Sequence, residues 1–476
     1  MKRAQGFRAK WGRRVVALSL LPLLLIGCAI GPNYRRPSVP VPDTFRGAPA
    51  TNSTTSLADT KWPDLFEDDN LKQLIATALE HNFDLAIAVE RVQEARARFQ
   101  ITEADRYPSV GAQSGFTANR PSRIGSNPMV PANSSIDSSY TQAGGVLSWE
   151  LDLWGRVRRL TESARAQYLA TEEGRRGVIV SLIADVTGNY FTLRERDLEL
   201  EIARGTGDVA ERNLRLVRLR HDHGAASGLD VHQAEQLLYT ATGQMASTQK
   251  DIGQAENALN LLLGKTPGDI ERGMAVDDFG LPPEVPPGLP SALLERRPDI
   301  RQAEELLIAA NAQIGVAQAY YFPQVSLTGF LGGQSRSLLD LFTGPARFWT
   351  IAPTAITPIF AGGQVRAGVR LSEAQKREMV IAYQKTIYTA FREVSDALVR
   401  YDRTREQRKQ ENQLVHALTE TTRLSNLRYQ GGLDSYLQVL DSERNLFQGR
   451  LALAQLRLQE LLSFVQLYKA LGGGWQ

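Results

Sequence analysis

The C-terminal segment carries the clearest pattern of hydrophobic positions in the chain. Apolar residues recur there at alternating spacings of three and four, which is the pattern of a coiled-coil seam. The pattern predicts one long helix over residues 435–471 that packs lengthwise against another helix. The seam positions are Leu433, Leu437, Leu440, Arg444, Phe447, Leu451, Ala454, Leu458, Leu461, Val465 and Tyr468, with Arg444 as the one charged member.

A second long helix is predicted just before this one, over residues 364–428. At ~1.5 Å per residue it extends on the order of 100 Å, beyond the usual length of a globular helix. Gly431 and Gly432 supply the positive φ that ends a helix, and Asp434 or Ser435 is placed to cap the next one. The two helices therefore form a hairpin whose tip lies at about 428–437.

The same tip occurs earlier in the chain, which indicates an internal duplication. The segment that starts at Arg220 aligns without a gap with the segment that starts at Arg428. The first tip is predicted at about 220–229, and its returning helix over 229–263. The matched residues are Arg220, Gly224, Ser227 and Leu229 with Arg428, Gly432, Ser435 and Leu437.

Each repeat also contains a stretch in which the period changes from helix to strand. Small, polar and aromatic residues alternate loosely, which favours β-hairpins at about 107–154 and about 322–361. Polar loops at 119–138 and 334–347 join the strands of each pair. The predicted organisation is a first repeat at 71–270, a proline-rich linker at 271–290 and a second repeat at 291–476.

Four strands are too few to close a membrane barrel, because the smallest such barrels have about eight. An open sheet edge in lipid leaves backbone groups unpaired, at several kcal/mol each. Several copies of the chain must therefore pool their strands, and three copies give about twelve.

The N-terminus is predicted to be a lipoprotein signal peptide, residues 1–27. Its basic residues precede a short apolar run and a small residue, Gly27, and Cys28 follows as the only cysteine of the chain. Cys28 is the predicted lipidation site, and a buried thiol is the alternative interpretation. Residues 28–70, rich in Pro, Ser, Thr and Asn, are predicted to form an extended arm that ties the lipid anchor to the body.

The charge and the motifs of the chain argue against nucleic-acid binding, a metal site and a phosphate-binding loop. The chain has 55 basic and 52 acidic residues, and removal of the leader leaves 49 against 52, so no nucleic-acid footprint remains. His221, His223 and His232 have spacing too weak for a metal site. Gly264-Lys265-Thr266 resembles the end of a phosphate loop, but the first glycine of that motif is replaced by Leu259. No catalytic residue, cofactor or metal is predicted.

Several motifs, in order along almost the whole mature chain, resemble one family. They are Glu150-Leu151-Asp152-Leu153-Trp154-Gly155-Arg156, Glu295-Arg296-Arg297-Pro298-Asp299-Ile300, Ala310-Asn311-Ala312-Gln313-Ile314-Gly315, Phe322-Pro323 and Leu467-Tyr468-Lys469-Ala470-Leu471-Gly472-Gly473-Gly474-Trp475. The chain resembles the outer-membrane factors of tripartite efflux systems, of the TolC and OprM type, in their lipoprotein, NodT-like branch. The resemblance implies a homotrimer with a twelve-stranded transmembrane β-barrel, four strands per chain, continuous with a long periplasmic α-helical barrel.

The resemblance also implies roles for residues at the tips. Leu437 and Asp441 match residues that ring the closed periplasmic aperture, and they share one helix face with Arg444. Arg428, Tyr429 and Arg444 match residues that tie neighbouring hairpins together, with Asp230 as a further partner of these cations. The alternative interpretation is that Leu437 is an ordinary leucine of the helix seam and that Asp441 and Arg444 are ordinary surface charges. Docking of an adaptor is expected at the tips, at Gly224, Ser227, Gly432 and Ser435, whereas His221 departs from the tyrosine usual in the family.

The expected function is a passive exit channel in the Gram-negative outer membrane for a multidrug efflux pump. Its expected partners are a periplasmic adaptor protein, an inner-membrane transporter of the resistance-nodulation-division class and outer-membrane lipid. Two alternatives remain at this point. One is the outer-membrane channel of a type I protein secretion system, and the other is a periplasmic scaffold lipoprotein without a pore.

Overall fold

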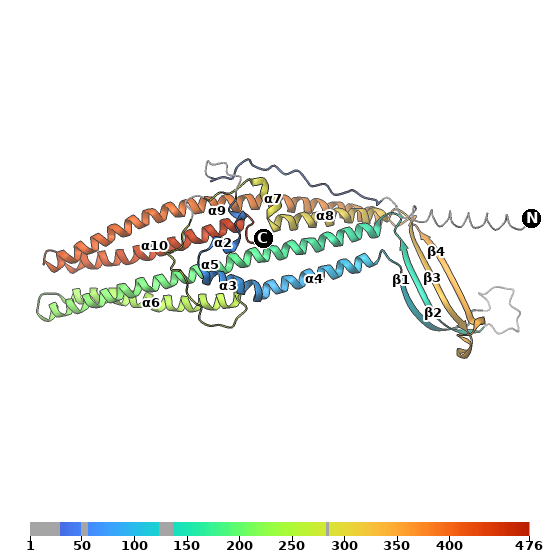
Figure 1. The fold of residues 1–476 in the computed structure, drawn as a ribbon, viewed down its shortest axis with the longest axis horizontal. Helices are drawn as coiled ribbons and strands as arrows, with labels where there is room; N and C mark the ends of the chain where they lie inside the picture. Colours follow the sequence, from blue (N-terminus) through green and yellow to red (C-terminus); the bar gives the residue numbers. More distant parts are fainter. Residues whose placement is uncertain (1–28, 49–55, 123–136, 282–284, 476) are drawn as a thin grey trace, which may run out of the picture. The chain divides into compact units, whose positions relative to one another are not determined.

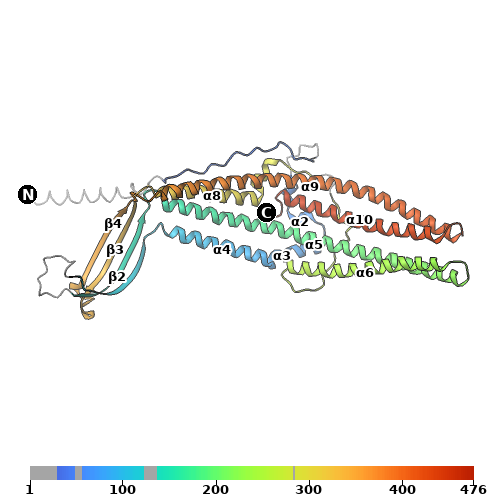
Figure 2. The same ribbon diagram turned by 180° about the vertical axis from the view of Figure 1, so that it is seen from behind.

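A computed structural model of the chain describes residues 29–48, 56–122, 137–281 and 285–475. These residues form two compact units, each built from segments of both repeats. The first unit comprises the described residues of 1–37 together with 93–170 and 304–382. The second comprises the described residues of 38–92, 171–303 and 383–476. Figures 1 and 2 show the strands of the first unit and the helical hairpins of the second from opposite sides.

The first unit contains one antiparallel sheet of four strands in the order β1-β2-β3-β4 (Figure 1). The two predicted hairpins are joined directly, because β2 of the first repeat pairs with β3 of the second along its length. Both hairpins therefore contribute to a single sheet. The strands are β1 (Ser109–Asn119), β2 (Ser138–Leu151), β3 (Gln324–Ser335) and β4 (Arg347–Ile356).

The strand register gives the sheet two faces of different chemistry, because residues paired across an antiparallel ladder share a face. The apolar face carries Val110, Phe116, Leu147, Trp149, Leu327, Leu331, Trp349 and Ile351. The polar face carries Gln113, Thr117, Gln142, Ser148, Ser326, Thr328, Thr350 and Thr354, with Phe330 and Phe348 stacked among them. One face therefore suits lipid and the other suits water, as in the wall of a membrane channel.

The two edges of the sheet are left open. Within the described residues, neither the outer edge of β1 nor that of β4 pairs with another strand. Unpaired backbone groups cost several kcal/mol each in lipid, so a sheet of this kind needs further strands from other copies.

The motif that starts at Glu150 makes the turn from β2 into helix α5 (Arg156–Asp222). The Arg156 guanidinium donates to both oxygens of Glu150, at 2.8 and 2.6 Å. The Asp152 carboxylate accepts from the backbone N–H groups of Val157 and Arg158, and so caps the helix. The Trp154 indole N–H donates to the Pro323 carbonyl at 2.8 Å, which ties the first β-hairpin to the start of the second.

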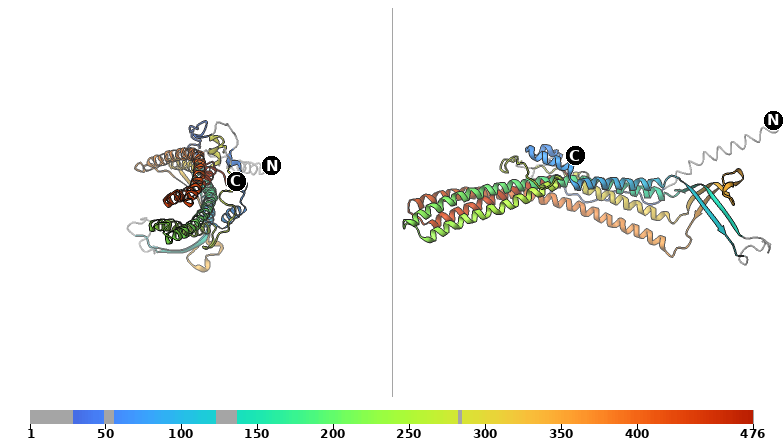
Figure 3. Two further views of the ribbon diagram at one scale, coloured as in Figure 1. Left: turned by 90° about the vertical axis from the view of Figure 1, so that its left-hand side faces the viewer. Right: turned by 90° about the horizontal axis from the view of Figure 1, so that it is seen from below.

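The helices predicted at 229–263, 364–428 and 435–471 are observed as α6 (Gly228–Leu262), α9 (Gln364–Gln430) and α10 (Tyr436–Ala470), within two residues of the predicted ends. The full set of helices is longer and also includes α3 (Asp69–His81), α4 (Phe83–Ala104), α5 and α8 (Pro298–Ala319), with the short helices α2 (Trp62–Leu65) and α7 (Leu293–Arg296) and the 3-10 turns η1 (Leu57–Asp59), η2 (Pro290–Ala292), η3 (Leu338–Asp340) and η4 (Gly344–Ala346). In Figure 3 the hairpins α5–α6 and α9–α10 reach the same end of the second unit. Among the described helices, none has a stretch long and apolar enough to cross a membrane.

The main core of the second unit surrounds Tyr190 and Phe191 on α5, and it includes part of the predicted arm. Phe66 is buried in this core, and Trp62 and Leu65 pack against it. The prediction of an extended arm up to residue 70 is therefore wrong for residues 56–66, which include η1 and α2 and dock on this core. Their few apolar side chains are too sparse for a helical period, yet they are enough to dock a short segment on an existing core.

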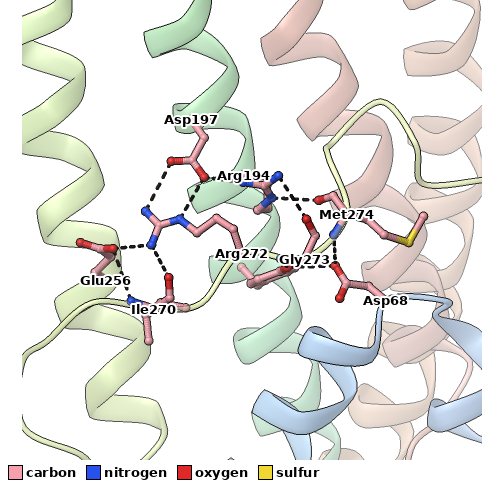
Figure 4. A network of polar contacts seen from close by, with 9 residues as sticks. Asp68, Arg194, Asp197, Glu256, Ile270, Arg272, Gly273 and Met274 are labelled. Carbon is pink, nitrogen blue, oxygen red and sulfur yellow. Dashed lines mark hydrogen bonds and ion pairs between the residues drawn. The ribbon is translucent and has the colours of Figure 1, made fainter.

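A polar network beside this core holds the segment 270–274 in place (Figure 4). Asp68 is 2% exposed. Its Oδ1 caps α3 by accepting from the N–H groups of Asn70 and Leu71, and its Oδ2 accepts from the Met274 N–H at 2.8 Å and the Tyr190 hydroxyl at 2.9 Å. Burial raises the pKa of Tyr190, so this hydroxyl remains a donor. One carboxylate thus joins α3, α5 and the loop after α6.

Candidate functional site at the hairpin tips

The first tip joins α5 to α6 and has the predicted glycine and cap. Gly224 has φ +74°, and the Ala225 N–H donates to the Arg220 carbonyl at 2.7 Å to close the helix end. Ser227 is the N-cap of α6. The Asp230 carboxylate accepts from both the backbone N–H and the hydroxyl of Ser227, which completes a capping box. Within its own chain, Asp230 therefore has a capping role that the sequence interpretation did not assign to it.

The second tip repeats this backbone geometry with different side-chain bonds. Gly432 has φ +73°, and the Leu433 N–H donates to the Arg428 carbonyl at 2.9 Å. Ser435 occupies the N-cap position of α10, but its side chain makes no capping hydrogen bond, contrary to the prediction. The Asp434 carboxylate is not a cap either. It binds the Arg428 guanidinium at 2.6 and 3.1 Å, because the two side chains meet across the glycine turn.

A small hydrophobic cluster joins the two tips within one chain. Tyr429 and Tyr436 pack edge to face, with ring centroids 5.4 Å apart. The guanidinium of Arg220, from the first hairpin, lies over the Tyr429 ring at 4.5 Å from its centroid. Tyr429 thus contacts the first hairpin inside the chain, and its predicted role in tying neighbouring hairpins at the aperture stays a prediction. The buried members of this tip cluster are Ala210, Leu214, Val217, Ala234, Leu237, Tyr429, Tyr436, Val439 and Leu440.

The face of α10 that bears Leu437 points away from this cluster. Leu437 is 52% exposed, and the side chains of Asp441 and Arg444 are both more than half exposed. An Arg444 guanidinium nitrogen donates to an Asp441 carboxylate oxygen at 3.4 Å. Asp441, predicted to ring the aperture, and Arg444, one of the residues predicted to tie neighbouring hairpins (the latch residues), are therefore paired within the chain.

The predicted seam is therefore wrong at three positions near the start of α10, whereas its members Leu440 and Phe447 are buried as predicted. Leu433, Leu437 and Arg444 are exposed, and the buried residues there are Tyr436, Val439, Leu440, Glu443 and Phe447. The helix contacts both α6 and α9, which buries a broader stripe than the single seam of a two-stranded coil. Further along, Leu451, Ala454, Leu461, Val465 and Tyr468 are buried as predicted.

Glu443 is a buried carboxyl to which the sequence pattern assigns no role. It is 6% exposed and accepts from the Asn213 amide of α5 at 2.7 Å and the Asn426 amide of α9 at 3.4 Å. It therefore links the two hairpins just behind the exposed face. Burial raises the pKa of Glu443 above its ordinary value of 4.5, while the two amides oppose this shift.

This raised pKa predicts that the tip loosens as pH rises. The folded chain binds the Glu443 proton more tightly than the unfolded chain, so the neutral carboxyl contributes stability that is fully present below 4.5. That contribution is lost as pH rises through the folded pKa. Hydrogen exchange of residues 427–445, corrected for intrinsic rates, should therefore show more opening at about pH 8 than at about pH 5.

Glu443→Gln should remove this pH dependence, because the glutamine keeps an acceptor for Asn213 but does not titrate. Glu420→Gln is the matched control, since Glu420 is an exposed residue of α9 that pairs with Arg423 at the surface. If the exchange of residues 427–445 depended on pH equally in the Glu443→Gln and Glu420→Gln chains, Glu443 would not be the group that controls opening of the tip.

The remaining predicted site residues are placed as follows. Gly224, Ser227, Gly432 and Ser435 are all exposed at the two tips. His232 contacts Glu235 at 2.9 Å, and Glu235 also pairs with Arg218, so this histidine belongs to a surface ion-pair group. In the part of the chain that the structure describes, no three His, Cys, Asp or Glu side chains cluster as metal ligands would. Cys28 lies outside the described residues, and its lipidation stays a prediction.

The sequence is similar to a known protein family and to characterised efflux proteins. The family model described as "Outer membrane efflux protein" matches twice, over residues 74–265 and 289–473, in line with the internal duplication. The antibiotic efflux pump outer membrane protein ArpC of Pseudomonas putida is 39% identical over 97% of this chain and 96% of its own length. The cation efflux system protein CusC of Escherichia coli is 35% identical over 95% of this chain and 97% of its own length.

A solved structure supports the fold directly. The open state of the MtrE outer membrane channel of Neisseria gonorrhoeae superposes with a TM-score of 0.85 at 32% identity, over 94% of this chain and 99% of that one. The predicted fold class, outer-membrane location and efflux-channel function are confirmed by these matches. The chain belongs to the outer membrane efflux protein family.

Proposed function

We propose that three copies of this chain form the passive exit channel of a tripartite efflux pump. The observation that carries the proposal is the four-stranded sheet, with one apolar face, one polar face and two edges unpaired within the described residues. Pairing of β1 in one copy with β4 of the next closes both edges and gives twelve strands. The apolar faces then meet lipid and the polar faces line the pore. The chain itself catalyses no reaction and uses no cofactor.

The gate of this channel is proposed at the exposed face of α10. Three copies of Leu437 and Asp441 ring the aperture, while Arg428, Tyr429 and Arg444 hold the tips together. The exposure of Leu437 supports this role, since a leucine of the helix seam would be buried. The contacts of Arg428 with Asp434 and of Tyr429 with Arg220 indicate that these two residues act by bracing the tip of their own chain.

The tips are also the proposed docking site for a periplasmic adaptor, which in turn contacts an inner-membrane transporter of the resistance-nodulation-division class. Both tips expose their glycine turns and an apolar side chain, Leu229 at the first and Leu433 at the second. Relatives named for antibiotic efflux and for cation efflux are similarly close in sequence, at 39% and 35% identity. The exported compound is therefore set by the transporter more than by this channel.

Topology in intact cells tests the proposed channel. An epitope inserted at Gly125, in the β1–β2 connection, should bind antibody on intact cells. The same epitope at Gly224, in the first hairpin tip, should bind only after the outer membrane is permeabilised. Equal behaviour of the two insertions, in either condition, would refute the placement of the sheet across the outer membrane with its helices in the periplasm.

A further inference from the structure

The apolar face of the sheet contains a groove that a channel wall does not need. The groove has a volume of about 690 Å³, within the ~300–1,000 Å³ range of small-molecule sites. It lies between the strands and the segment 336–346, which connects β3 to β4. Its lining residues are Ala112, Gln113, Ser114, Ala143, Gly144, Leu331, Gly332, Gly333, Leu341, Phe342 and Arg347.

Small residues on the strands leave the floor of this groove bare. Ala112, Ser114, Ala143 and Gly333 occupy apolar-face positions where neighbouring pairs carry large side chains. A Cβ on Gly333 would lie 2.1 Å from the Leu341 carbonyl oxygen, so only glycine lets the connecting segment rest directly on the sheet. The groove is therefore a consequence of specific small residues under a folded loop.

The rim of the groove combines apolar side chains with positive charge. Leu341 is 4% exposed and anchors the segment, whereas Leu338, Leu339 and Phe342 are 71%, 91% and 81% exposed. Arg336 and Arg347 are both exposed at the two ends of the segment. The Arg347 side chain thus lines an apolar groove, and Arg336 is exposed at the other end of the segment that covers it.

The position of the groove in the sheet selects its occupant. The helices join the sheet at the start of β1 and the end of β4, so the β3–β4 connection lies at the opposite end. With the helices in the periplasm, this end meets the outer leaflet of the outer membrane. A ligand there must present hydrocarbon to the groove and negative charge to the guanidinium groups.

We propose that the groove binds one acyl chain of a phosphorylated glycolipid of the outer leaflet, with a phosphate held by Arg336 and Arg347. The inference rests on the proposed placement of the sheet across the outer membrane. Hydrocarbon gains little by moving from the bilayer into an apolar groove, because both surroundings are apolar. Selectivity therefore comes from charge-assisted hydrogen bonds between arginine and phosphate, and the groove fixes the position of the lipid.

Lipid retention by the purified full-length channel tests this site. Channels from outer membranes, reconstituted in nanodiscs, would be exposed to bisphosphorylated lipid A, phosphatidylethanolamine or inorganic phosphate, and bound lipid counted by native mass spectrometry. The wild-type channel should retain lipid A, and neither phosphatidylethanolamine nor inorganic phosphate should displace it. The double variant R336Q/R347Q should retain roughly tenfold less, the effect of losing about one charge-assisted hydrogen bond.

Two further variants separate the groove from general surface charge. Ala143→Leu fills the floor of the groove and should also reduce retention, with both arginines intact. Arg120→Gln is the control, because Arg120 is an exposed arginine near the end of β1 that already pairs with Asp137 at 3.5 Å. Retention of lipid A unchanged in both R336Q/R347Q and Ala143→Leu would overturn the proposal, as would displacement by phosphatidylethanolamine or free phosphate.

The conductance of the same preparations distinguishes failure of the lipid site from failure of the proposed channel. A wild-type channel that conducts normally but retains no lipid A overturns only the lipid site. Oligomeric state on unheated gels confirms that each variant has assembled before its lipid is counted.

Discussion

Replacing Arg428 and Tyr429 together with alanine is expected to open the periplasmic end of the channel. Single-channel conductance in planar bilayers should rise, and cells should admit large antibiotics that the wild-type channel excludes. Tyr429 is buried in the tip cluster, where a large-to-small change costs about 3–5 kcal/mol. The change also removes the aromatic ring beneath the Arg220 guanidinium, and with it the tie between the two hairpins.

The Arg428 half of the double variant acts on the turn itself. Arg428 and Asp434 make two hydrogen bonds across Gly431 and Gly432, so the ion pair closes a turn that the glycines leave pliable. This pair is exposed, and its loss alone should have a smaller effect than the loss of Tyr429. Each change occurs three times in the proposed trimer, so modest effects in one chain add up around the aperture.

Asp441→Ala, unlike the double variant, should not open the channel. At ~6 Å and an effective dielectric of 20–80, each pair of like charges around a threefold axis costs roughly 0.7–3 kcal/mol. In the proposed ring, the three aspartates would therefore oppose closure, even though Arg444 offsets part of the charge of Asp441 within each chain. Their removal should leave the channel closed while weakening its cation selectivity and any block by multivalent cations.

A matched arginine controls for the loss of surface charge near the tip. Arg423 is exposed on α9 and pairs with Glu420, as Arg428 pairs with Asp434, but it lies outside the turn. Arg423→Ala should leave conductance unchanged. If Asp441→Ala opened the channel as widely as the double variant, the roles assigned to the latch and the ring would be wrong.

The long elements of this fold are predictable because their signal is repeated many times. The periodicity and the duplicated glycine tips locate α9 and α10 within two residues of their observed ends. The strand pairs are also found, since the period changes at both. The direct pairing of β2 with β3 is not predictable by periodicity, because it joins residues far apart in the chain whose composition resembles that of the other strands.

The side-chain contacts of the site are less predictable for a different reason. The exposure of Leu437 depends on which neighbours α10 contacts, and a seam pattern alone does not reveal that it packs on two helices. Glu443 is buried because Asn213 and Asn426 reach it from α5 and α9. Asp434 pairs with Arg428 rather than capping α10, since the turn brings the two side chains together. Each contact depends on one or two residues and leaves no periodic trace.

The second large effect is expected from Asp68→Ala, which should strongly destabilise the second unit. The buried carboxylate accepts four hydrogen bonds, from the N–H groups of Asn70, Leu71 and Met274 and from the Tyr190 hydroxyl. Alanine removes the cap of α3, which is worth ~1 kcal/mol. It also leaves a buried N–H and a buried hydroxyl without their acceptor, at roughly 1–3 kcal/mol each. The total loss is on the order of 4 kcal/mol.

The loop that follows α6 should become mobile in the same variant. Gly273 lies so close to Asp68 that a Cβ there would approach the carboxylate within 2.2 Å, and the Gly273 N–H donates to the Tyr190 hydroxyl. Arg194 of α5 still donates to the Met274 carbonyl, and Arg272 still pairs with Asp197 of α5. The loop should therefore loosen from α3 while staying attached to α5 (Figure 4). Hydrogen exchange at residues 69–75 and 270–276 should therefore rise more than exchange at the hairpin tips.

Asp68→Asn and Asp69→Ala complete this test. Asparagine keeps one oxygen for the cap of α3 but turns an N–H₂ group toward the Met274 N–H, so its melting temperature should lie between those of the wild type and Asp68→Ala. Asp69 is the adjacent aspartate, with its side chain 94% exposed and paired with Lys72 at the surface, so Asp69→Ala should change stability by less than about 0.5 kcal/mol. Thermal melting followed by helical circular dichroism measures all three. Asp68→Ala melting at the same temperature as Asp69→Ala would show that the buried carboxylate does not hold these elements together.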